Sequence, residues 1–210
     1  CFVCNASGNS IHFLRRYENL DFVDAVETIA SSVGLEVPYT KQIVEETKAK
    51  EINDEANTIY KNCLKSADGK KAVEYLKSRG ISGETAAFFN LGYAKDGWTN
   101  LFDTVASKYS KADIAESGLF STKDKKYFDF FRARLMFPIR NIRGQCVAFG
   151  GRIIGDGDPK YLNSPETKTY IKSNELFGLY EARSLTKNLD SLIVVEGYMD
   201  VIALYQNGVK

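Results

Sequence analysis

The feature of this sequence with the clearest chemical potential is an acidic residue at the end of an apolar run. Ser191-Leu-Ile-Val-Val195 is apolar and β-branched, which is typical of a strand covered on both faces. Glu196 follows, Gly197 allows a tight turn, and a helical pattern begins at Tyr198. Ligands of open α/β sheets collect at the carboxyl ends of strands, where a carboxylate can hold Mg²⁺ or serve as an acid or base in phosphoryl transfer. Asp200 is within reach of the same pocket.

Each of the two acidic residues also has a simpler interpretation. Glu196 could be a solvated strand end, although the glycine directly after it weakens this reading. Asp200 could supply favourable negative charge at the N-terminus of a helix.

A second candidate is a basic stretch between Arg132 and Lys172, which carries eight basic and three acidic residues although the whole chain has a formal charge of +1. Guanidinium and ammonium groups bind phosphates, and a tyrosine ring can stack on an unpaired base. Gly150-Gly151 would let a nucleic-acid backbone approach. The stretch favours single-stranded nucleic acid over the alternative of a solvated hairpin surface. Its candidate binding residues are Arg140, Arg152, Lys160, Tyr161, Asn163 and Lys172.

Cysteines form a third candidate site. Cys1 and Cys4 have the two-residue spacing of a zinc knuckle, in which two thiolates point at one metal. This is half a site, because structural zinc takes four ligands. His12 is interpreted as an ordinary residue near the start of a helix, and Cys63 and Cys146 as small core residues.

The elements that position these residues can be predicted from periodicity and turn signals. We expect a mixed fold, α+β or α/β, with a mainly helical N-terminal part, a small and mostly antiparallel sheet, and then a final strand and helix. A domain boundary is placed near residues 36–42. The expected helices are 20–34, 41–66, 71–78, 83–90, 98–109, 111–117 and 174–185, and the expected strands are 134–140, 145–152, 160–163 and 191–195.

Composition excludes several classes of protein. A hydrophobic fraction of 44% over 210 residues excludes wholesale disorder, and 28 basic against 27 acidic residues exclude an acidic tail or a uniformly basic coat. No apolar run approaches the roughly 18–20 residues of a membrane helix. Four irregularly spaced cysteines indicate a reducing compartment, so we expect a cytoplasmic protein without a membrane partner. Both ends read as cuts through a longer protein.

Several long motifs, taken in order, resemble the bacterial DNA primases of the DnaG type over essentially the whole chain. They are Cys1-Phe-Val-Cys4, Leu20-Asp-Phe-Val-Asp-Ala-Val26, Phe137-Pro-Ile-Arg140, Phe149-Gly-Gly-Arg152, Pro159-Lys-Tyr-Leu-Asn-Ser-Pro-Glu-Thr167, Leu176-Phe-Gly-Leu-Tyr-Glu-Ala182 and Val195-Glu-Gly-Tyr-Met-Asp200.

The resemblance implies three domains: the end of a zinc-binding domain (1–38), the N-terminal subdomain of an RNA polymerase domain (41–189) and the start of a Toprim fold (190–210). It also implies a nucleotidyltransferase that lays RNA primers on single-stranded DNA from ribonucleoside triphosphates, with replicative helicase and single-strand-binding protein as partners.

Individual residues match positions of known role in that family. Glu196 matches the metal-binding catalytic glutamate, which implies Mg²⁺ or Mn²⁺, and Cys1 and Cys4 match two zinc ligands. Arg79 matches another basic functional position. The template-binding and catalytic ridge is matched by Arg152, Lys160, Tyr161, Asn163 and Lys172.

The chain lacks the upstream Cys-x-x-His pair and the later aspartates of the Toprim metal site. We therefore expect it to hold zinc weakly and to bind nucleic acid without synthesising primers by itself. Two alternatives stay open: another Toprim enzyme, such as a topoisomerase or recombination-repair protein, and a non-catalytic single-strand-binding module.

Overall fold

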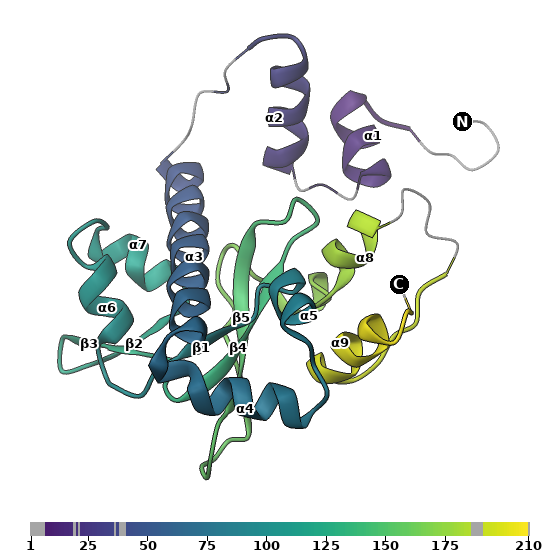
Figure 1. Cartoon of the computed structure of the whole chain (residues 1–210). Coiled ribbons are helices and arrows are strands. Elements are labelled where there is room, and N and C mark those ends of the chain that lie inside the picture. Colours follow the sequence, from purple (N-terminus) through teal and green to yellow (C-terminus); the bar gives the residue numbers. More distant parts are fainter. Residues whose placement is uncertain are drawn as a thin grey trace. The chain divides into compact units, whose positions relative to one another are not determined.

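The computed structural model describes residues 7–18, 20, 22–35, 37, 41–185 and 191–209, and for 41–47 it describes the backbone alone. Internal contacts divide the chain into two units, Cys1–Val44 and Glu45–Lys210, and each is described by itself (Figure 1). Within these described ranges, no helix is both long and apolar enough to cross a membrane.

The first unit contains helices α1 (Ser10–Tyr17) and α2 (Phe22–Ser32). Asn9 caps α1, because its side-chain oxygen accepts the backbone N–H of His12 at 3.0 Å, and the His12 ring nitrogen Nδ1 lies 3.1 Å from the same oxygen. His12 therefore has the local structural role expected of it. Gly34 adopts φ +70° just after α2, a conformation that glycine takes readily at the end of a helix. Cys1 and Cys4 lie outside the described residues.

The second unit is built around the long helix α3 (Lys41–Lys65) and a sheet. The predicted apolar stripe of α3 is buried, with Ile52 and Ala56 fully covered. Tyr60 packs edge-on against Phe149 of the sheet, with 5.5 Å between ring centroids. This stripe is what holds α3 against the sheet and forms the core.

The sheet is antiparallel and has the order β1-β4-β5-β6. The strands β4 and β5 are central and almost wholly buried, which explains their continuous apolar sequences. The predicted strands at 134–140, 145–152 and 160–163 are confirmed, whereas β1 and a separate two-stranded hairpin, β2–β3, were not expected. The bounds are β1 (Gly92–Ala94), β2 (Phe120–Lys123), β3 (Lys126–Asp129), β4 (Arg134–Arg140), β5 (Cys146–Ile153) and β6 (Tyr161–Asn163).

Short helices surround this sheet (Figure 1). The helices expected at 98–109 and 174–185 are shorter than predicted, since each loses its first residues to a turn or a 3₁₀ segment. The bounds are η1 (Ala67–Gly69), α4 (Lys70–Ser78), α5 (Gly83–Phe88), α6 (Asn100–Val105), α7 (Lys111–Glu116), η2 (Lys172–Asn174), α8 (Leu179–Leu185) and α9 (Tyr198–Gln206).

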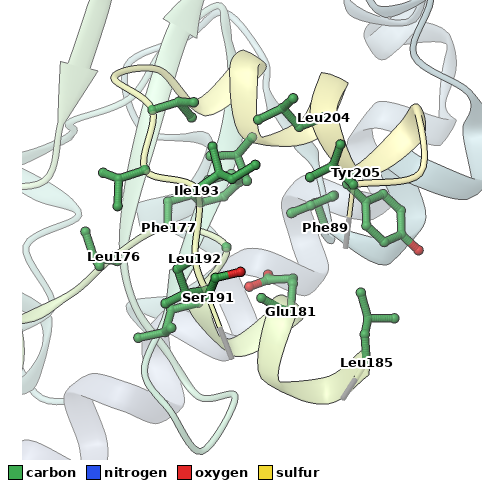
Figure 2. Close-up of a pocket in the computed structure, with 17 residues that line it drawn as sticks. Phe89, Leu176, Phe177, Glu181, Leu185, Ser191, Leu192, Ile193, Leu204 and Tyr205 are labelled. Carbon is green, nitrogen blue, oxygen red and sulfur yellow. The ribbon is translucent and has the colours of Figure 1, made fainter. Parts of the chain in front are cut away.

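The predicted strand at 191–195 is wrong. The segment is not a strand, and Leu192, Ile193 and Val194 are 52%, 66% and 77% exposed. The sheet order ends at β6, so none of the described strands pairs with this segment through backbone hydrogen bonds. One side of it lines an apolar cavity of about 280 Å³ between α8 and α9 (Figure 2).

The helix that follows this segment is well packed. Ile202 of α9 is fully buried. Tyr205 stacks on Phe88 of α5 with 4.4 Å between ring centroids, and the Gln206 side-chain oxygen accepts the Ser82 backbone N–H at 2.7 Å. Helix α9 is therefore fixed to the rest of the second unit.

Candidate nucleic-acid interface

A ladder of alternating cations and aromatic rings runs from α4 to β6. Arg152 and Tyr161 are register partners on β5 and β6, so their side chains share one face of the sheet. The Arg152 guanidinium carbon lies 4.5 Å from the ring centroid of Tyr75 and 5.4 Å from that of Tyr161, and its Nη1 donates to the Tyr161 hydroxyl at 3.2 Å. Arg79 lies over the other end, 5.4 Å from the Tyr75 centroid. Such cation–π contacts hold guanidinium groups in place while leaving their edges able to donate.

The ladder brings together three residues that the sequence assigned to nucleic-acid binding from separate segments: Arg79, Arg152 and Tyr161. Tyr75 was missed, although its position four residues before Arg79 on a helix was a usable signal. Within the described residues, the Arg152 Nε is buried without a hydrogen-bond partner. A buried donor of this kind is costly, so the Nε is a polar group that the described contacts leave unsatisfied.

A pocket of about 410 Å³ lies between Tyr161 of the cation–aromatic ladder and Glu196. It places Tyr161, Asn163 and Lys172 of the predicted ridge beside Glu196. Lys160 is exposed directly before β6 and does not line the pocket. The lining residues are Ile139, Tyr161, Asn163, Tyr170, Lys172, Glu175, Leu176, Phe177, Val195, Glu196, Gly197, Tyr198 and Val201.

The acidic residues Glu196 and Asp200 lie on either side of the start of α9. Glu196 lines the pocket, and Gly197 is the N-cap of α9 in an extended conformation. Asp200 lies in the first helical turn, with its side chain folded back toward Gly197, and does not line the pocket.

Carboxylate oxygens are the ligands that Mg²⁺ prefers, so Glu196 has the right chemistry. Among the described residues, however, no three His, Cys, Asp or Glu side chains form a group that could hold a metal ion. Within the part of the chain that the structure describes, Glu196 and Asp200 alone do not make up a metal site.

Glu175 is a lining residue that sequence reasoning missed. Burial raises its pKa to about 7, and the charge of Lys50 opposes that rise. Tyr170, Lys172 and Glu196 face the same pocket. The Glu175 carboxyl is therefore partly protonated near neutral pH, which lowers the negative charge of the pocket lining.

Replacing Glu175 by glutamine should remove a pH-dependent loss of stability. Because the folded-state pKa is raised from 4.5 to about 7, the wild-type carboxyl favours the folded state below pH 4.5 and loses that contribution as the pH rises through 7. Urea unfolding should show E175Q and wild type equally stable at pH 4.5, and E175Q more stable by about 1–3 kcal/mol at pH 8. Glu74→Gln, an exposed site on α4, serves as the control. Parallel pH profiles for E175Q and wild type would contradict this assignment.

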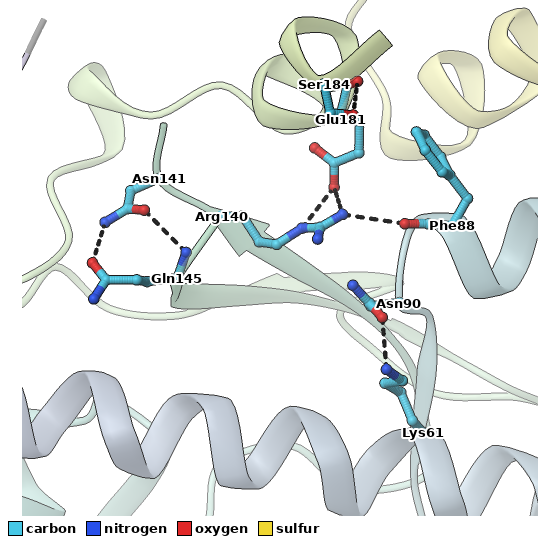
Figure 3. A network of polar contacts seen from close by, with 8 residues as sticks. All are labelled: Lys61, Phe88, Asn90, Arg140, Asn141, Gln145, Glu181 and Ser184. Atoms are coloured by element: carbon cyan, nitrogen blue, oxygen red, sulfur yellow. Dashed lines mark hydrogen bonds and ion pairs between the residues drawn. The ribbon is translucent and has the colours of Figure 1, made fainter. Parts of the chain in front are cut away.

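Arg140, predicted to bind nucleic acid, is instead committed to an internal ion pair (Figure 3). Its Nη2 and Nε donate to Glu181 Oε1 at 2.6 and 2.9 Å, and Nη2 also donates to the Phe88 carbonyl oxygen at 3.1 Å. The Arg140 and Glu181 side chains are only 12% and 3% exposed. A guanidinium this occupied has little capacity left for phosphate, so Arg140 is left out of the binding set.

The glycine pair on β5 also differs from expectation. A Cβ on Gly150 would meet the ring of Tyr198, and a Cβ on Gly151 would meet Phe131, so both positions are covered by protein. They provide close packing on the two faces of the strand and do not open it to nucleic acid.

A second aromatic and cationic surface lies beside the hairpin β2–β3, where Trp98 before α6 and Arg132 after β3 meet Phe128 of β3, and sequence reasoning missed Trp98. Trp98 is 64% exposed, and the Arg132 guanidinium carbon lies 4.3 Å from its ring centroid. Phe128 packs edge-on against the same ring at 5.7 Å. Exposed aromatic rings beside cations are the typical platform for unpaired bases.

Comparison with known proteins agrees with this geometry. The family model for the N-terminal domain of the DNA primase catalytic core matches residues 59–183, and that for the CHC2 zinc finger matches residues 1–45. The DNA primase of Pseudomonas putida is 46% identical over 222 aligned residues, which cover 100% of this chain and 34% of that protein.

Solved structures give the same result. A DnaG primase catalytic domain bound to single-stranded DNA superposes with a TM-score of 0.75 at 40% identity, covering 79% of this chain and 52% of that one. The zinc-binding and RNA polymerase domains of the Aquifex aeolicus primase give 0.70 at 32% identity, covering 100% and 51%. The chain thus spans about a third of its curated relative and about half of each solved structure. Since the catalytic-core model covers more than half of its residues, the chain belongs to the family of bacterial DnaG-type DNA primases.

Proposed function

We propose that this chain binds the single-stranded template of a primase. In the full-length protein, it would support synthesis of short RNA primers from ribonucleoside triphosphates by metal-dependent nucleotidyl transfer. The supporting observation is that the cation–aromatic ladder ends in the pocket that holds Glu196. Template-directed synthesis needs a phosphate-binding surface next to the reacting atoms, because positioning supplies much of the rate.

The ridge residues take different roles in this proposal. Arg152, Lys160 and Lys172 bind backbone phosphates, and Arg79 extends the positive surface along α4. Tyr161, which is 38% exposed, offers its ring to an unpaired base. Asn163 accepts the Tyr198 hydroxyl at 2.8 Å, which orients its amide at the mouth of the pocket.

The Trp98–Arg132 surface gives the template a further place to bind. Its exposed ring and adjacent guanidinium have the same chemistry as the ladder and lie on a different element of the second unit. We propose that it contacts a more distant part of the same strand.

Two metals belong to the proposal. Glu196, supported by Asp200, would help to hold Mg²⁺ or Mn²⁺, which offsets the charge of a triphosphate. Cys1 and Cys4 would bind structural zinc, since paired thiolates at this spacing fit zinc and the zinc-finger model covers them.

Family membership supports the wider setting of the proposal. We propose the domain limits 1–38, 41–189 and 190–210 for the zinc-binding, polymerase and Toprim parts. Replicative helicase and single-strand-binding protein would be the partners, at the replication fork in the bacterial cytoplasm.

The test is incorporation of labelled ribonucleotides by the full-length protein on a single-stranded template with Mg²⁺ or Mn²⁺. Template-dependent RNA of short length is the expected product. Strand cleavage or relaxation without polymerisation would favour a different Toprim enzyme, and binding without any chemistry would favour a non-catalytic module.

Binding by the 210-residue chain should be dominated by phosphate contacts. Arg152→Ala and Lys172→Ala should each flatten the plot of log K against log salt by about 0.7, because each releases one fewer counterion from single-stranded DNA. Tyr161→Ala should cost about 1–3 kcal/mol with the slope unchanged, since it removes stacking alone. Fluorescence anisotropy across a salt series measures both.

A matched control is Lys48→Ala, which removes an exposed lysine paired with Glu51 on α3 and should leave the slope unchanged. If all three ridge variants bind like wild type, the ladder is only a solvated strand surface.

A further inference from the structure

Gly150 sits in the middle of a central strand, where a glycine contributes no packing and weakens a sheet. Its register partners are Phe137 on β4 and Asn163 on β6. Opposite residues of antiparallel strands point to the same face, so these three residues form one row across three strands. The row lies beside the next one, which contains Arg152 and Tyr161.

Tyr198 fills the gap over Gly150. Its ring stacks on Phe137, with 5.1 Å between centroids and 11° between planes, and Phe177 closes its edge at 4.9 Å. Its hydroxyl donates to Asn163 Oδ1 at 2.8 Å. A Cβ on Gly150 would lie 2.6 Å from Tyr198 Cζ and 2.8 Å from its hydroxyl oxygen. Rings on two sides leave Tyr198 no room to shift, so only glycine fits at position 150.

Tyr198 is also the first residue of α9, two residues after Glu196. The Gly197 carbonyl oxygen between them accepts the backbone N–H groups of Asp200 at 3.1 Å and Val201 at 3.3 Å, which ties the turn to the start of α9. The ring of Tyr198 therefore connects the segment that carries Glu196 to the face of β5 and β6.

We propose that Tyr198 is a positioning residue, which seats on Gly150 and thereby fixes Glu196 relative to the template-binding face. That Tyr198 fixes Glu196 for catalysis, the functional half of this inference, rests on the proposed primase activity. That Tyr198 packs on Gly150, the structural half, does not.

The structural half is tested by a double-mutant cycle on the 210-residue chain. Gly150→Ala should lower the melting temperature by about 3–10 °C, because the new methyl group overlaps the Tyr198 ring. In a Tyr198→Leu background, which lacks the overlapping ring atoms, the same change should cost less than about 2 °C. Tyr198→Phe keeps the ring atoms that overlap the new methyl group, so in that background Gly150→Ala should lower the melting temperature as much as it does in wild type.

Gly151→Ala is the matched control. Its Cβ would meet Phe131 at 2.7 Å on the opposite face, so its cost should be the same with Tyr198 or Leu at position 198. If Gly150→Ala lowers the melting temperature equally with Tyr and with Leu at position 198, the packing of Tyr198 on Gly150 does not explain the glycine.

The functional half uses the full-length protein well below its melting temperature. Tyr198→Leu should lower kcat for primer synthesis about 10–100-fold, the range expected when a reacting group is displaced by about 1 Å, with the template Kd changed less than about two-fold. Tyr198→Phe should retain most of kcat, because it keeps the ring in its seat. An unchanged kcat in Tyr198→Leu would show that the ring only packs. Wild type without primer synthesis would refute the proposed function while leaving the melting-temperature cycle interpretable.

Discussion

Replacing Glu196 by glutamine in the full-length protein should abolish primer synthesis while leaving template binding intact. Glutamine keeps the shape of the side chain and removes the charge that a divalent cation requires. The residue is exposed at the pocket and outside the cation–aromatic ladder, so the DNA-binding surface should not change. We expect a loss of at least about 10³-fold in kcat, on the scale seen when transition-state charge loses its stabilisation.

Incorporation of labelled ribonucleotides measures primer synthesis, and fluorescence anisotropy with a labelled single strand measures template binding. Glu84→Gln, an exposed acidic residue in the first turn of α5, is the control and should retain full synthesis. Full activity in Glu196→Gln would show that any metal is held by other residues.

Breaking the Arg140–Glu181 pair should have the largest effect on stability. Removing one partner of a buried ion pair leaves an uncompensated charge, and we expect Arg140→Ala or Glu181→Ala to cost about 3–5 kcal/mol. The pair joins β4 to α8, and the Phe88 carbonyl connects α5 to the same guanidinium (Figure 3). Urea unfolding of the 210-residue chain measures this cost.

The double replacement Arg140→Met with Glu181→Leu should recover much of that loss, because no charge is then left unpaired. The exposed pair Lys48–Glu51 is the control, and removing either residue should cost less than about 1 kcal/mol. If Arg140→Ala proves as mild as this control and instead weakens DNA binding, the original assignment of Arg140 to the template surface would be restored.

Elements with strong periodicity could be predicted from the sequence. The stripe of α3 and the buried pair β4–β5 are long enough for their periods to be clear. β1 and the hairpin β2–β3, whose strands have three or four residues, were missed, and β2 is largely exposed. In such strands, pairing with a neighbour decides the conformation more than local preference does.

Candidate site residues could be proposed from the sequence where the type of side chain and its spacing pointed to phosphate binding or stacking. Arg152, Tyr161 and Lys172 had the right type and spacing, and the structure places them around one pocket and ladder. Arg140 had the same type, but its partner Glu181 is 41 residues away, so no local pattern could show that it is occupied. Tyr75 was missed although its spacing to Arg79 was a local signal, and its contact with Arg152 depends on the fold.

The attachment of α9 has a consequence for how the chain acquires its structure. The Gln206 side-chain oxygen accepts the Ser82 backbone N–H across 124 residues, so α5 reaches its final surroundings only after synthesis has passed Gln206. Contacts of such separation are slow to form, since the entropy of closing the loop is lost before the contact is gained. Until then Phe88 lacks the ring of Tyr205 that covers it. Nascent chains on the ribosome should therefore expose an aromatic patch on α5, which makes this helix the place where chaperones and aggregation compete with folding.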